Sequence, residues 1–332
     1  MRADLPAELT AALARESHGL SRSDAARRAG TMSDTYRSGG GSAVIADARD
    51  ALAYALVRMP ATFAAVAACL DAVAVARPDF APQSLIDAGA GPGTATWAAR
   101  AAFPTLQTLS MLDANPALRD LAQRLAAASP AMRDATYRLG DAATGLGALA
   151  AADLTLASYV IAELDAAAAR RLVERLWEKT TGVLLLVEPG TPDGTRRILA
   201  ARANLIAAGA HVLAPCPHAA PCPMAEPAWC HFAQRLARSR DHLRIKQADV
   251  PYEDEKYSYV AVSRPSAAAR DSRVVATPRL SKAAVALRLC TPAGQLAEVA
   301  VPRRDKPAYA AARRLRWGDT TTAGLTPDGF QK

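Results

Sequence analysis

Between residues 83 and 215, short apolar runs alternate with segments of helical spacing, and this alternation leaves few possible architectures. The apolar runs are SLIDAGAG, TLSMLDAN, ATYRLGDA, DLTLASYV, GVLLLVEPG and AHVLAP. Strands that are joined through helices lie parallel in one sheet, and the helices cover both of its faces. We therefore predict an α/β protein built on a doubly wound, Rossmann-like sheet.

The segments on either side of this region have different textures. Residues 5–75 are rich in alanine and have helical spacing, interrupted by the turn-forming SGGGS at 38–42. KYSYVAVSR (256–264) alternates like one more strand, and 279–304 is typical of two strands joined at Thr291 to Gly294. We divide the chain into an N-terminal helical segment (1–80), a sheet domain (81–264) with an insertion at 216–255, and a C-terminal β-hairpin extension (265–332).

Composition and hydropathy favour a globular protein with no membrane partner. About half of the 332 residues are apolar, enough for a sizeable core. The first residues, MRADLPAELTAALARE, lack the apolar run of a signal peptide, and the uncharged stretch from Met59 to Leu70 is too short to cross a bilayer. We expect a cytoplasmic protein.

The first chemical motif is LIDAGAGPGTATWAA at 85–99. A predicted strand containing Asp87 runs into Gly89, Gly91 and Gly93 and then into an alanine-rich helix. Missing side chains let the backbone approach a ligand at the carboxyl edge of a sheet, as in nucleotide-binding folds. The simpler alternative is a tight connection from strand to helix with no ligand.

Two carboxylates extend this motif into a cofactor hypothesis. Asp113 closes the next strand, 22 residues after Gly91, where a carboxylate accepts hydrogen bonds from ribose hydroxyls. Asp141, after the third strand, could accept from an adenine amino group. The spacing suits NAD as well as S-adenosylmethionine, but G-x-G-x-G and the strand order resemble class I methyltransferases, so we favour S-adenosylmethionine. For each aspartate alone, a helix cap or turn is the alternative.

Catalytic residues are not predicted. Many methyltransferases that act on exocyclic amines carry an Asn/Asp-Pro-Pro-aromatic stretch after the fourth strand, and here that position reads ASYVIAEL (157–164). Ser158, Tyr159 and Glu163 are polar side chains near the expected methyl group. None of them identifies a general base.

The segment APCPHAAPCPMAEPAWCH (214–231) concentrates three of the five cysteines and two of the five histidines. It lies between the predicted sixth and seventh strands, where about 40 residues replace a short turn, and unsupported loops longer than ~12 to 15 residues are uncommon. Cys216, Cys222 and Cys230 between stiffening prolines suit thiolate ligation of one ion or cluster.

The residue types and their spacing do not identify the fourth ligand or the metal. Cys290 could complete a four-thiolate set if the C-terminal hairpin packs on the insertion, and His218 or His231 could instead complete a set of three cysteines and one histidine. Four thiolates suit zinc or an iron–sulfur cluster, and spacing does not choose between them. Other predicted roles are structural: Cys69 in a helical core, His211 at a strand end and His242 at the surface.

Positive charge is concentrated in the last part of the chain. Residues 201–332 carry 20 basic and 11 acidic side chains, whereas 1–80 carry 9 of each and 81–200 carry 11 and 12. The basic runs RLARSRDHLRIK (235–246), RRDK (303–306) and RRLR (313–316) alternate with aromatic residues, so we predict a nucleic-acid surface rather than only a solvated basic face. The aromatic residues that could stack on bases are Tyr252, Tyr257, Tyr259, Tyr309 and Trp317.

Several of these stretches together resemble a known family. They are LIDAGAGPGTATWAA, YALVRMPATFAAV, LLLVEPGTPDG, APCPH…CPM…WCHF…RLARSR, EDEKYSYVAVSR and LCTPAG…RWGD. The chain resembles the methyltransferase-like small-ribosomal-subunit assembly proteins of bacteria and mitochondria over roughly residues 50–320. The cysteine string is the most specific part of the resemblance.

The resemblance implies a class I methyltransferase fold, association with small-subunit ribosomal RNA and a four-iron, four-sulfur (4Fe-4S) cluster. By this resemblance, the ligands of the cluster are expected to be Cys216, Cys222, Cys230 and Cys290. We expect a protein that binds S-adenosylmethionine and the small ribosomal subunit or its precursor RNA, with a structural cluster. An active rRNA methyltransferase with a structural zinc site is the alternative, and a non-enzymatic assembly factor is slightly favoured because binding features outnumber catalytic ones.

Overall fold

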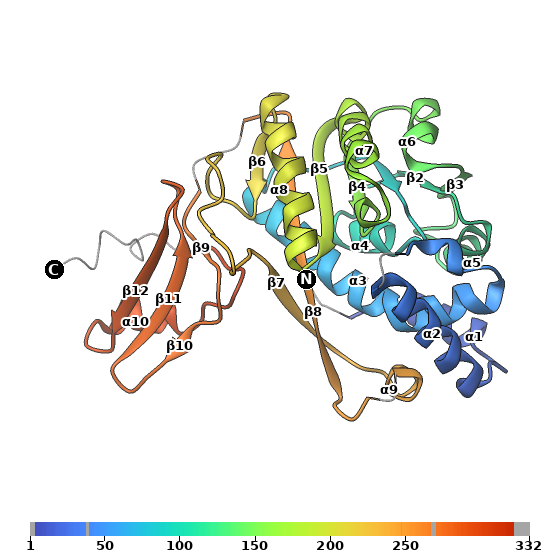
Figure 1. Ribbon diagram of the computed structural model, residues 1–332, viewed down its shortest axis with the longest axis horizontal. Helices are drawn as coiled ribbons and strands as arrows, with labels where there is room; N and C mark the ends of the chain where they lie inside the picture. Colours follow the sequence, from blue (N-terminus) through green and yellow to red (C-terminus); the bar gives the residue numbers. More distant parts are fainter. Residues whose placement is uncertain (1–3, 38–39, 247, 267–269, 322–332) are drawn as a thin grey trace.

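The computed structural model describes residues 4–37, 40–246, 248–266 and 270–321, and these form one large and one small sheet with their helices (Figure 1). The large sheet has the order β3-β2-β1-β4-β5-β8-β6, with β7 paired to β8. Its strands are β1 (Ser84–Ala88), β2 (Thr108–Asp113), β3 (Thr136–Leu139), β4 (Ala152–Ser158), β5 (Thr180–Pro189), β6 (His211–Ala214), β7 (Phe232–Ala237) and β8 (Tyr252–Ser263).

All six predicted strands are present, and their directions confirm the predicted fold. Strands β1 to β5 pair in parallel, whereas β8 lies antiparallel between β5 and β6. The register of β5 on β8 runs from Val183 opposite Ser263 to Pro189 opposite Tyr257. A parallel sheet with one reversed strand between the fifth and sixth is the Rossmann-like class I methyltransferase arrangement.

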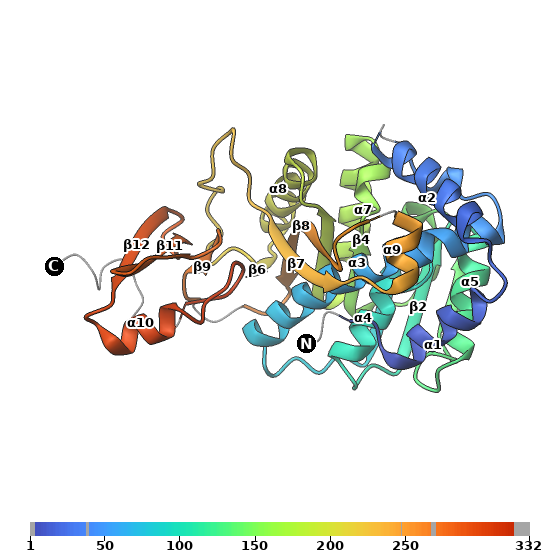
Figure 2. The same ribbon diagram turned by 90° about the horizontal axis from the view of Figure 1, so that it is seen from below.

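Helices cover both faces of the large sheet (Figure 2). Helix α3 (Ala48–Ala76) packs with α4 (Thr94–Ala102) and α5 (Pro116–Ala127) on one face. The other face carries α6 (Ala142–Gly145), α7 (Ala166–Glu178) and α8 (Pro192–Ala207). Leu85 and Leu154 face the first group and Ile86 and Leu184 face the second, so each strand face supplies one apolar core.

The N-terminal helices confirm the predicted helical texture, but the longest is central rather than peripheral. Helices α1 (Ala7–Glu16) and α2 (Arg22–Arg37) lie at the outside, whereas α3 contacts four strands and packs Met59, Phe63 and Leu70 into the core. By length and composition α3 could cross a membrane, with 56% of its most apolar window buried inside the protein. Its packing against the sheet is that of a core helix.

The predicted insertion contains more regular structure than the sequence indicated. Strand β7 pairs antiparallel with residues 252–257 of β8, and helix α9 (Arg240–Lys246) lies at the tip between them. We call β7, α9 and residues 252–257 the arm (Figure 1). The arm contacts α2 and α3. The strand predicted from 256 therefore begins four residues earlier, because its first half has β7 as a partner.

The small sheet confirms the predicted C-terminal hairpin. Strand β11 (Ala284–Cys290) pairs with β12 (Leu296–Pro302), with β9 (Arg273–Val274) and β10 (Arg279–Leu280) along β11. Helix α10 (Lys306–Ala312) packs on the same hairpin, which buries Val285, Leu287 and Val301. Residues 322–332 of the predicted extension lie outside the described residues. Figure 1 shows this C-terminal unit beside the main body.

Candidate nucleoside site and cysteine centre

The glycine loop has a backbone that other residues rarely adopt. Gly89, Gly91 and Gly93 have φ angles of +71°, +53° and +82°. At Gly89 a Cβ atom would lie 2.6 Å from the Val160 side chain, so this position has no room for one. Gly93 ends the loop in the left-handed region and α4 begins at the next residue. The loop thus follows β1 at the carboxyl edge of the sheet, where it was predicted.

Asp87 bonds to the first turn of α4 and does not face solvent. Its side chain is fully buried, and Oδ2 accepts hydrogen bonds from the Thr96 backbone N at 3.0 Å and from Thr96 Oγ1 at 2.7 Å. Burial raises the pKa of Asp87 to about 6, and the bonds from Thr96 oppose that rise. The contacts show that Asp87 ties the end of β1 to the first turn of α4.

Asp113 lies directly beside the glycine loop. Its Oδ2 accepts from the Gly91 backbone N at 2.9 Å, and its Oδ1 accepts from the Asn115 backbone N at 2.8 Å. Tyr137 Oη donates to the Gly91 carbonyl at 2.7 Å from the neighbouring strand. Burial raises the pKa of the Asp113 carboxyl, and the backbone donors oppose this. The carboxylate therefore links the loop after β1 to the end of β2.

Asp141 follows β3 as predicted, and its hydrogen bonds are those of a helix cap. Its Oδ1 accepts from the backbone N of Ala143 and of Thr144, each at 3.0 Å, at the start of α6. The carboxylate is exposed. Its proposed contact with adenine stays a prediction.

A strap that the sequence did not reveal crosses the same edge of the sheet. In the segment 40–45, Ser42 donates from its backbone N and from Oγ to Glu163 Oε2 at 3.1 and 3.0 Å. Asn115 Nδ2 donates to the carbonyls of Ser42 at 3.2 Å and Ile45 at 2.9 Å. We call residues 40–45 the strap. Asn115 follows β2 and Glu163 follows β4, and β1 lies between these two strands in the sheet. The strap therefore passes over the glycine loop that follows β1. SGGGS signalled only a turn, and its residues 38 and 39 lie outside the described residues.

A second unpredicted group occupies the position after β4. Tyr159 has a φ of +61°, which is uncommon for a residue other than glycine. Its hydroxyl donates to Glu255 Oε1 at 3.0 Å, and Arg58 Nη2 donates to the same oxygen at 3.0 Å. The Arg58 guanidinium also lies 5.8 Å from the centre of the Tyr159 ring. This Tyr159–Glu255–Arg58 group joins β4, the arm and α3, and no spacing in the sequence indicated it.

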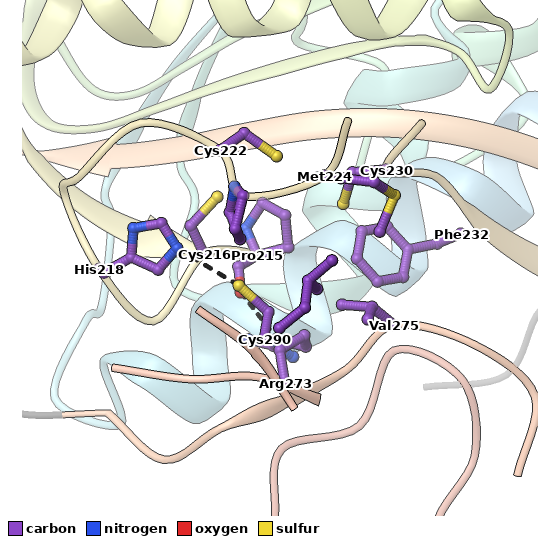
Figure 3. A pocket seen from close by; sticks show the side chains of 12 residues that line it. Pro215, Cys216, His218, Cys222, Met224, Cys230, Phe232, Arg273, Val275 and Cys290 are labelled. Atoms are coloured by element: carbon purple, nitrogen blue, oxygen red, sulfur yellow. Dashed lines mark hydrogen bonds between the residues drawn. The ribbon is translucent and has the colours of Figure 1, made fainter. Parts of the chain in front are cut away.

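The four predicted cysteines come together. Cys216, Cys222, Cys230 and Cys290 line one cavity of about 20 Å³, three of them from the segment 215–231 and the fourth from the end of β11 (Figure 3). The remaining lining is mostly apolar and includes Pro223, Met224, Phe232, Val275 and Leu296. The C-terminal hairpin therefore packs on the cysteine segment, as a four-cysteine site requires.

The environment of these thiols disfavours their charged form. Burial raises the pKa of Cys216 and Cys230 and raises that of Cys290 to about 12, and neighbouring cysteines raise each of the three further. Thiolates placed together in such a cavity repel one another unless a cation neutralises them. The donor set and its apolar lining fit a thiolate-bound metal. In the part of the chain that is described, no three His, Cys, Asp or Glu side chains already form a metal-holding group.

Hydrogen bonds hold the cysteine segment against the main sheet. Thr195 Oγ1 and Ser258 Oγ donate to the Cys230 carbonyl at 3.1 and 3.0 Å. Trp229 Nε1 donates to the Gly190 carbonyl at 2.9 Å. His218 Nε2 lies 3.3 Å from Cys290 Sγ, so this histidine contacts the fourth cysteine.

The predicted exposure of two tyrosines and one histidine was wrong, whereas the predicted burial of one cysteine was confirmed. Tyr257 and Tyr259 are 6% and 5% exposed in the core beside Phe232, so they cannot stack on RNA bases. His242, expected at the surface, is 1% exposed because α9 folds it against Glu253 of β8. Cys69 is fully buried in α3, as predicted.

Comparison with known proteins gives one family and several distant structures. The family model described as "Mitochondrial small ribosomal subunit Rsm22" matches residues 48–322. The chain is 29% identical over 297 residues to the human "Ribosome assembly protein METTL17, mitochondrial", and the alignment covers 84% of this chain and 64% of that protein. The chain thus spans less than two thirds of the length of this curated relative.

Several of the solved structures that resemble the chain are methyltransferases, and their sequence identity to it is low. A putative RNA methyltransferase from Pyrococcus horikoshii is 13% identical with a TM-score of 0.40, covering 62% of this chain and 86% of that one. Magnesium protoporphyrin IX methyltransferase from Synechocystis, with bound SAM, is 13% identical with a TM-score of 0.40, covering 71% and 92%. An O-methyltransferase family protein from Burkholderia thailandensis is 16% identical with a TM-score of 0.42, covering 66% and 61%.

Proposed function

The chain belongs to the mitochondrial small ribosomal subunit Rsm22 family, and from that membership we propose that it is a methyltransferase-like protein that assembles the small ribosomal subunit by binding its RNA. The relative METTL17 is named as a ribosome assembly protein, which supports the same role here. The observation on this chain that carries the RNA part of the proposal is the charge of the C-terminal unit.

More than half of the basic side chains in this unit are exposed and form no ion pair among the described residues. Residues 270–321 carry 11 basic and 4 acidic side chains. Around α10 lie six exposed cations that form no ion pair with a carboxylate among the described residues, and we call them the α10 basic surface: Arg303, Arg304, Lys306, Arg313, Arg314 and Arg316. Phosphate groups fit such a surface, because they exchange their counterions for fixed cations.

The arm contributes less free charge than its sequence suggests. Arg235 pairs with Asp254, while Arg238 and Lys246 both pair with Glu253. Paired cations have their charge already compensated, so the α10 basic surface is the better RNA site. Arg240 and Arg244 at the tip of the arm stay exposed and serve as matched controls.

The RNA proposal can be tested by measuring binding to small-subunit rRNA against salt concentration. Replacing Arg303, Arg304, Arg313 and Arg314 by Gln should weaken binding and lower the slope of log K against log salt by about one per lost phosphate contact. The double variant Arg240→Gln/Arg244→Gln should bind nearly as wild type. Equal losses in the two variants would contradict the assignment to α10.

We further propose that the glycine loop binds S-adenosylmethionine. The left-handed glycines let the backbone approach a ligand at the carboxyl edge of β1. Asp113 lies beside this loop, where its carboxylate would accept hydrogen bonds from the ribose hydroxyls. The strap 40–45 supplies a cover for this ligand.

The contacts after β4 favour binding of the cofactor without methyl transfer. In this fold the methyl-acceptor atom lies near that position. Here the Tyr159 hydroxyl donates a hydrogen bond to Glu255, which also accepts from Arg58. Val160 packs on Gly89. A tyrosine already committed to an internal carboxylate is a poor general base, and its pKa is raised well above the usual value, chiefly by burial.

Calorimetry with S-adenosylhomocysteine and methyl transfer from labelled S-adenosylmethionine separate the two functional candidates. We expect wild type to bind the ligand, a Gly91→Val variant to lose binding, and neither to methylate small-subunit RNA. Methyl transfer by wild type that Gly91→Val abolishes would instead establish the alternative, an active rRNA methyltransferase.

For the cysteine centre we propose a structural 4Fe-4S cluster held by Cys216, Cys222, Cys230 and Cys290, with zinc as the alternative. The four converging thiols support a four-cysteine centre, and the family resemblance favours iron. When bound, the metal would supply the positive charge that keeps four buried thiolates together. Anaerobic purification with metal and sulfide analysis tests this, and about four irons per chain are expected.

A further inference from the structure

Three arginines surround the cysteine segment without any acidic partner. Arg202 of α8 is 4% exposed, Arg273 of β9 is 6% exposed, and Arg270 is partly buried. None of them forms an ion pair with a carboxylate among the residues that the structure describes. The guanidinium stays charged in proteins, so the three positive charges need compensation from another source.

Their hydrogen bonds go to backbone carbonyls and leave donors unused. Arg202 Nη2 donates to His218 O at 2.7 Å and Ala220 O at 3.0 Å, inside the turn between Cys216 and Cys222. Its Nε is buried with no acceptor in the described residues. These bonds position the turn, but a carbonyl carries only a partial charge and does not neutralise a cation.

The other two arginines repeat this pattern. Arg273 Nε donates to Pro215 O at 2.9 Å, next to Cys216, and Nη1 donates to Gly318 O at 2.7 Å. Arg270 Nη1 donates to the carbonyl of Val212 in β6, and its Nε also lacks an acceptor in the described part of the chain. Figure 3 shows Arg273 below Cys290 in the cavity.

The cysteine thiols are the groups beside these arginines that can become anions. Burying a charge without a partner is unfavourable, whereas burying it beside the opposite charge recovers part of that cost. Four thiolates on a zinc ion or on an oxidised four-iron cluster keep a net negative charge. Arg273 lines the same cavity as the four cysteines, and Arg202 bonds to the turn between Cys216 and Cys222, so these charges lie beside the thiols.

We infer that Arg202, Arg270 and Arg273 are the counter-cations of an anionic four-thiolate metal centre, an inference that rests on the metal centre proposed above. Arg202 and Arg273 additionally position the turn and the strand end that carry the ligands. The inference selects Cys290 over His218 as the fourth ligand, because a neutral imidazole in place of a thiolate would reduce the negative charge that the arginines meet.

Arginine-to-glutamine variants of the full chain, purified anaerobically, test the inference. Arg270→Gln is the charge test, since its bond to Val212 lies outside the cysteine segment. Arg202→Gln and Arg202→Lys separate charge from positioning. The control is Arg264→Gln, because Arg264 also donates to two carbonyls, of Trp177 and Thr180, but in another part of the fold.

The readouts are metal retained against a chelator, the reduction potential of any iron cluster, and thermal unfolding of the metal-free protein. Arg202→Gln and Arg270→Gln each remove a cation that attracts the thiolates, so each should bind metal at least about tenfold more weakly, whereas Arg264→Gln should bind it as wild type does. An iron cluster in Arg270→Gln should have a more negative potential, because a lost cation destabilises the reduced, more negative state. Arg202→Lys should retain more metal than Arg202→Gln.

The metal-free Arg270→Gln variant should unfold at or above the temperature of the metal-free wild type, because an uncompensated charge has been removed. Wild-type metal retention in Arg270→Gln, or an equal loss in Arg264→Gln, would overturn the inference while leaving the metal centre standing. A wild type that holds neither iron nor zinc after anaerobic purification would overturn the metal centre, and this inference with it.

Discussion

Gly89 has no room for a side chain, because the loop that contains it packs against the turn after β4. A Cβ atom would lie 2.6 Å from Val160, and the φ of +71° strains any other residue. We expect Gly89→Ala to lower the free energy of unfolding by about 1–3 kcal/mol. Urea unfolding measures this, with Gly147→Ala as the control, since a Cβ there meets nothing within 4 Å. Equal stabilities of the two variants would contradict this account of the loop.

Asp87 should make stability depend on pH in a direction opposite to that of most carboxylates. Burial raises its pKa from the ordinary 3.8 to about 6. Between these values the folded state keeps a proton that the unfolded state has lost, so the free energy of unfolding falls as pH rises from about 4 to 6. Asp87→Asn removes this titration while its amide oxygen can still accept from Thr96.

The measurement for Asp87 is urea unfolding of both proteins at several pH values. The stability of Asp87→Asn relative to wild type should rise across this window by about 2–3 kcal/mol and then stay constant. A constant difference between the two proteins from about pH 4 to 7 would show that Asp87 is not buried as described.

Individual side chains were predictable only where local sequence decides their role. The left-handed glycines follow from the glycine pattern after a strand, and Asp113 follows from its position at the next strand end. The Tyr159–Glu255–Arg58 group depends on residues nearly 200 positions apart in sequence, so no spacing encodes it. The burial of Tyr257 and Tyr259 likewise depends on β7, which covers them with Phe232.

At the scale of elements, α3 supplies much of the core on its face of the sheet. Phe63 is 1% exposed and lies in the cluster that joins α3 to β1, β4 and β5. Phe63→Ala should lower the free energy of unfolding by about 3–5 kcal/mol, because it leaves a cavity in a close-packed core. Val75 in the same helix is 68% exposed, so Val75→Ala should change stability by less than about 0.5 kcal/mol. Chemical denaturation compares the two.

Strands with an internal apolar pattern were predictable, and β7 was not. The buried runs of β1, β4 and β5 are continuous, as expected for strands covered on both faces. In FAQRLA the buried residues are Phe232 and Leu236, four positions apart, which fits a helix as well as a strand. Only the pairing of β7 with the first half of β8 decides the matter, and that pairing is a tertiary contact.

At the scale of the whole molecule, the C-terminal unit docks on the main body through the cysteine segment. Arg273 bonds to the Pro215 carbonyl, and the rings of His231 and Trp317 lie 4.8 Å apart. The spacing left Cys290, His218 and His231 open as the fourth ligand, and the family resemblance predicted that Cys290 would join the other three cysteines. The sequence could not predict the bond from Arg273 or the contact between His231 and Trp317, because these contacts form only when the C-terminal unit docks on the main body.

Docking and RNA binding should therefore both depend on the proposed metal centre. Cys222→Ser removes one proposed ligand from the cysteine segment. It leaves the α10 basic surface unchanged, because that surface lies on the C-terminal unit, which carries Cys290. We expect this variant to lose its metal, to bind small-subunit rRNA more weakly, and to expose the C-terminal unit to limited proteolysis. Cys69→Ala is the control, because Cys69 is buried in α3 and should leave metal and RNA binding unchanged. RNA affinity equal to wild type in a metal-free Cys222→Ser protein would show that polar and aromatic contacts alone orient the unit, and that the metal serves another purpose.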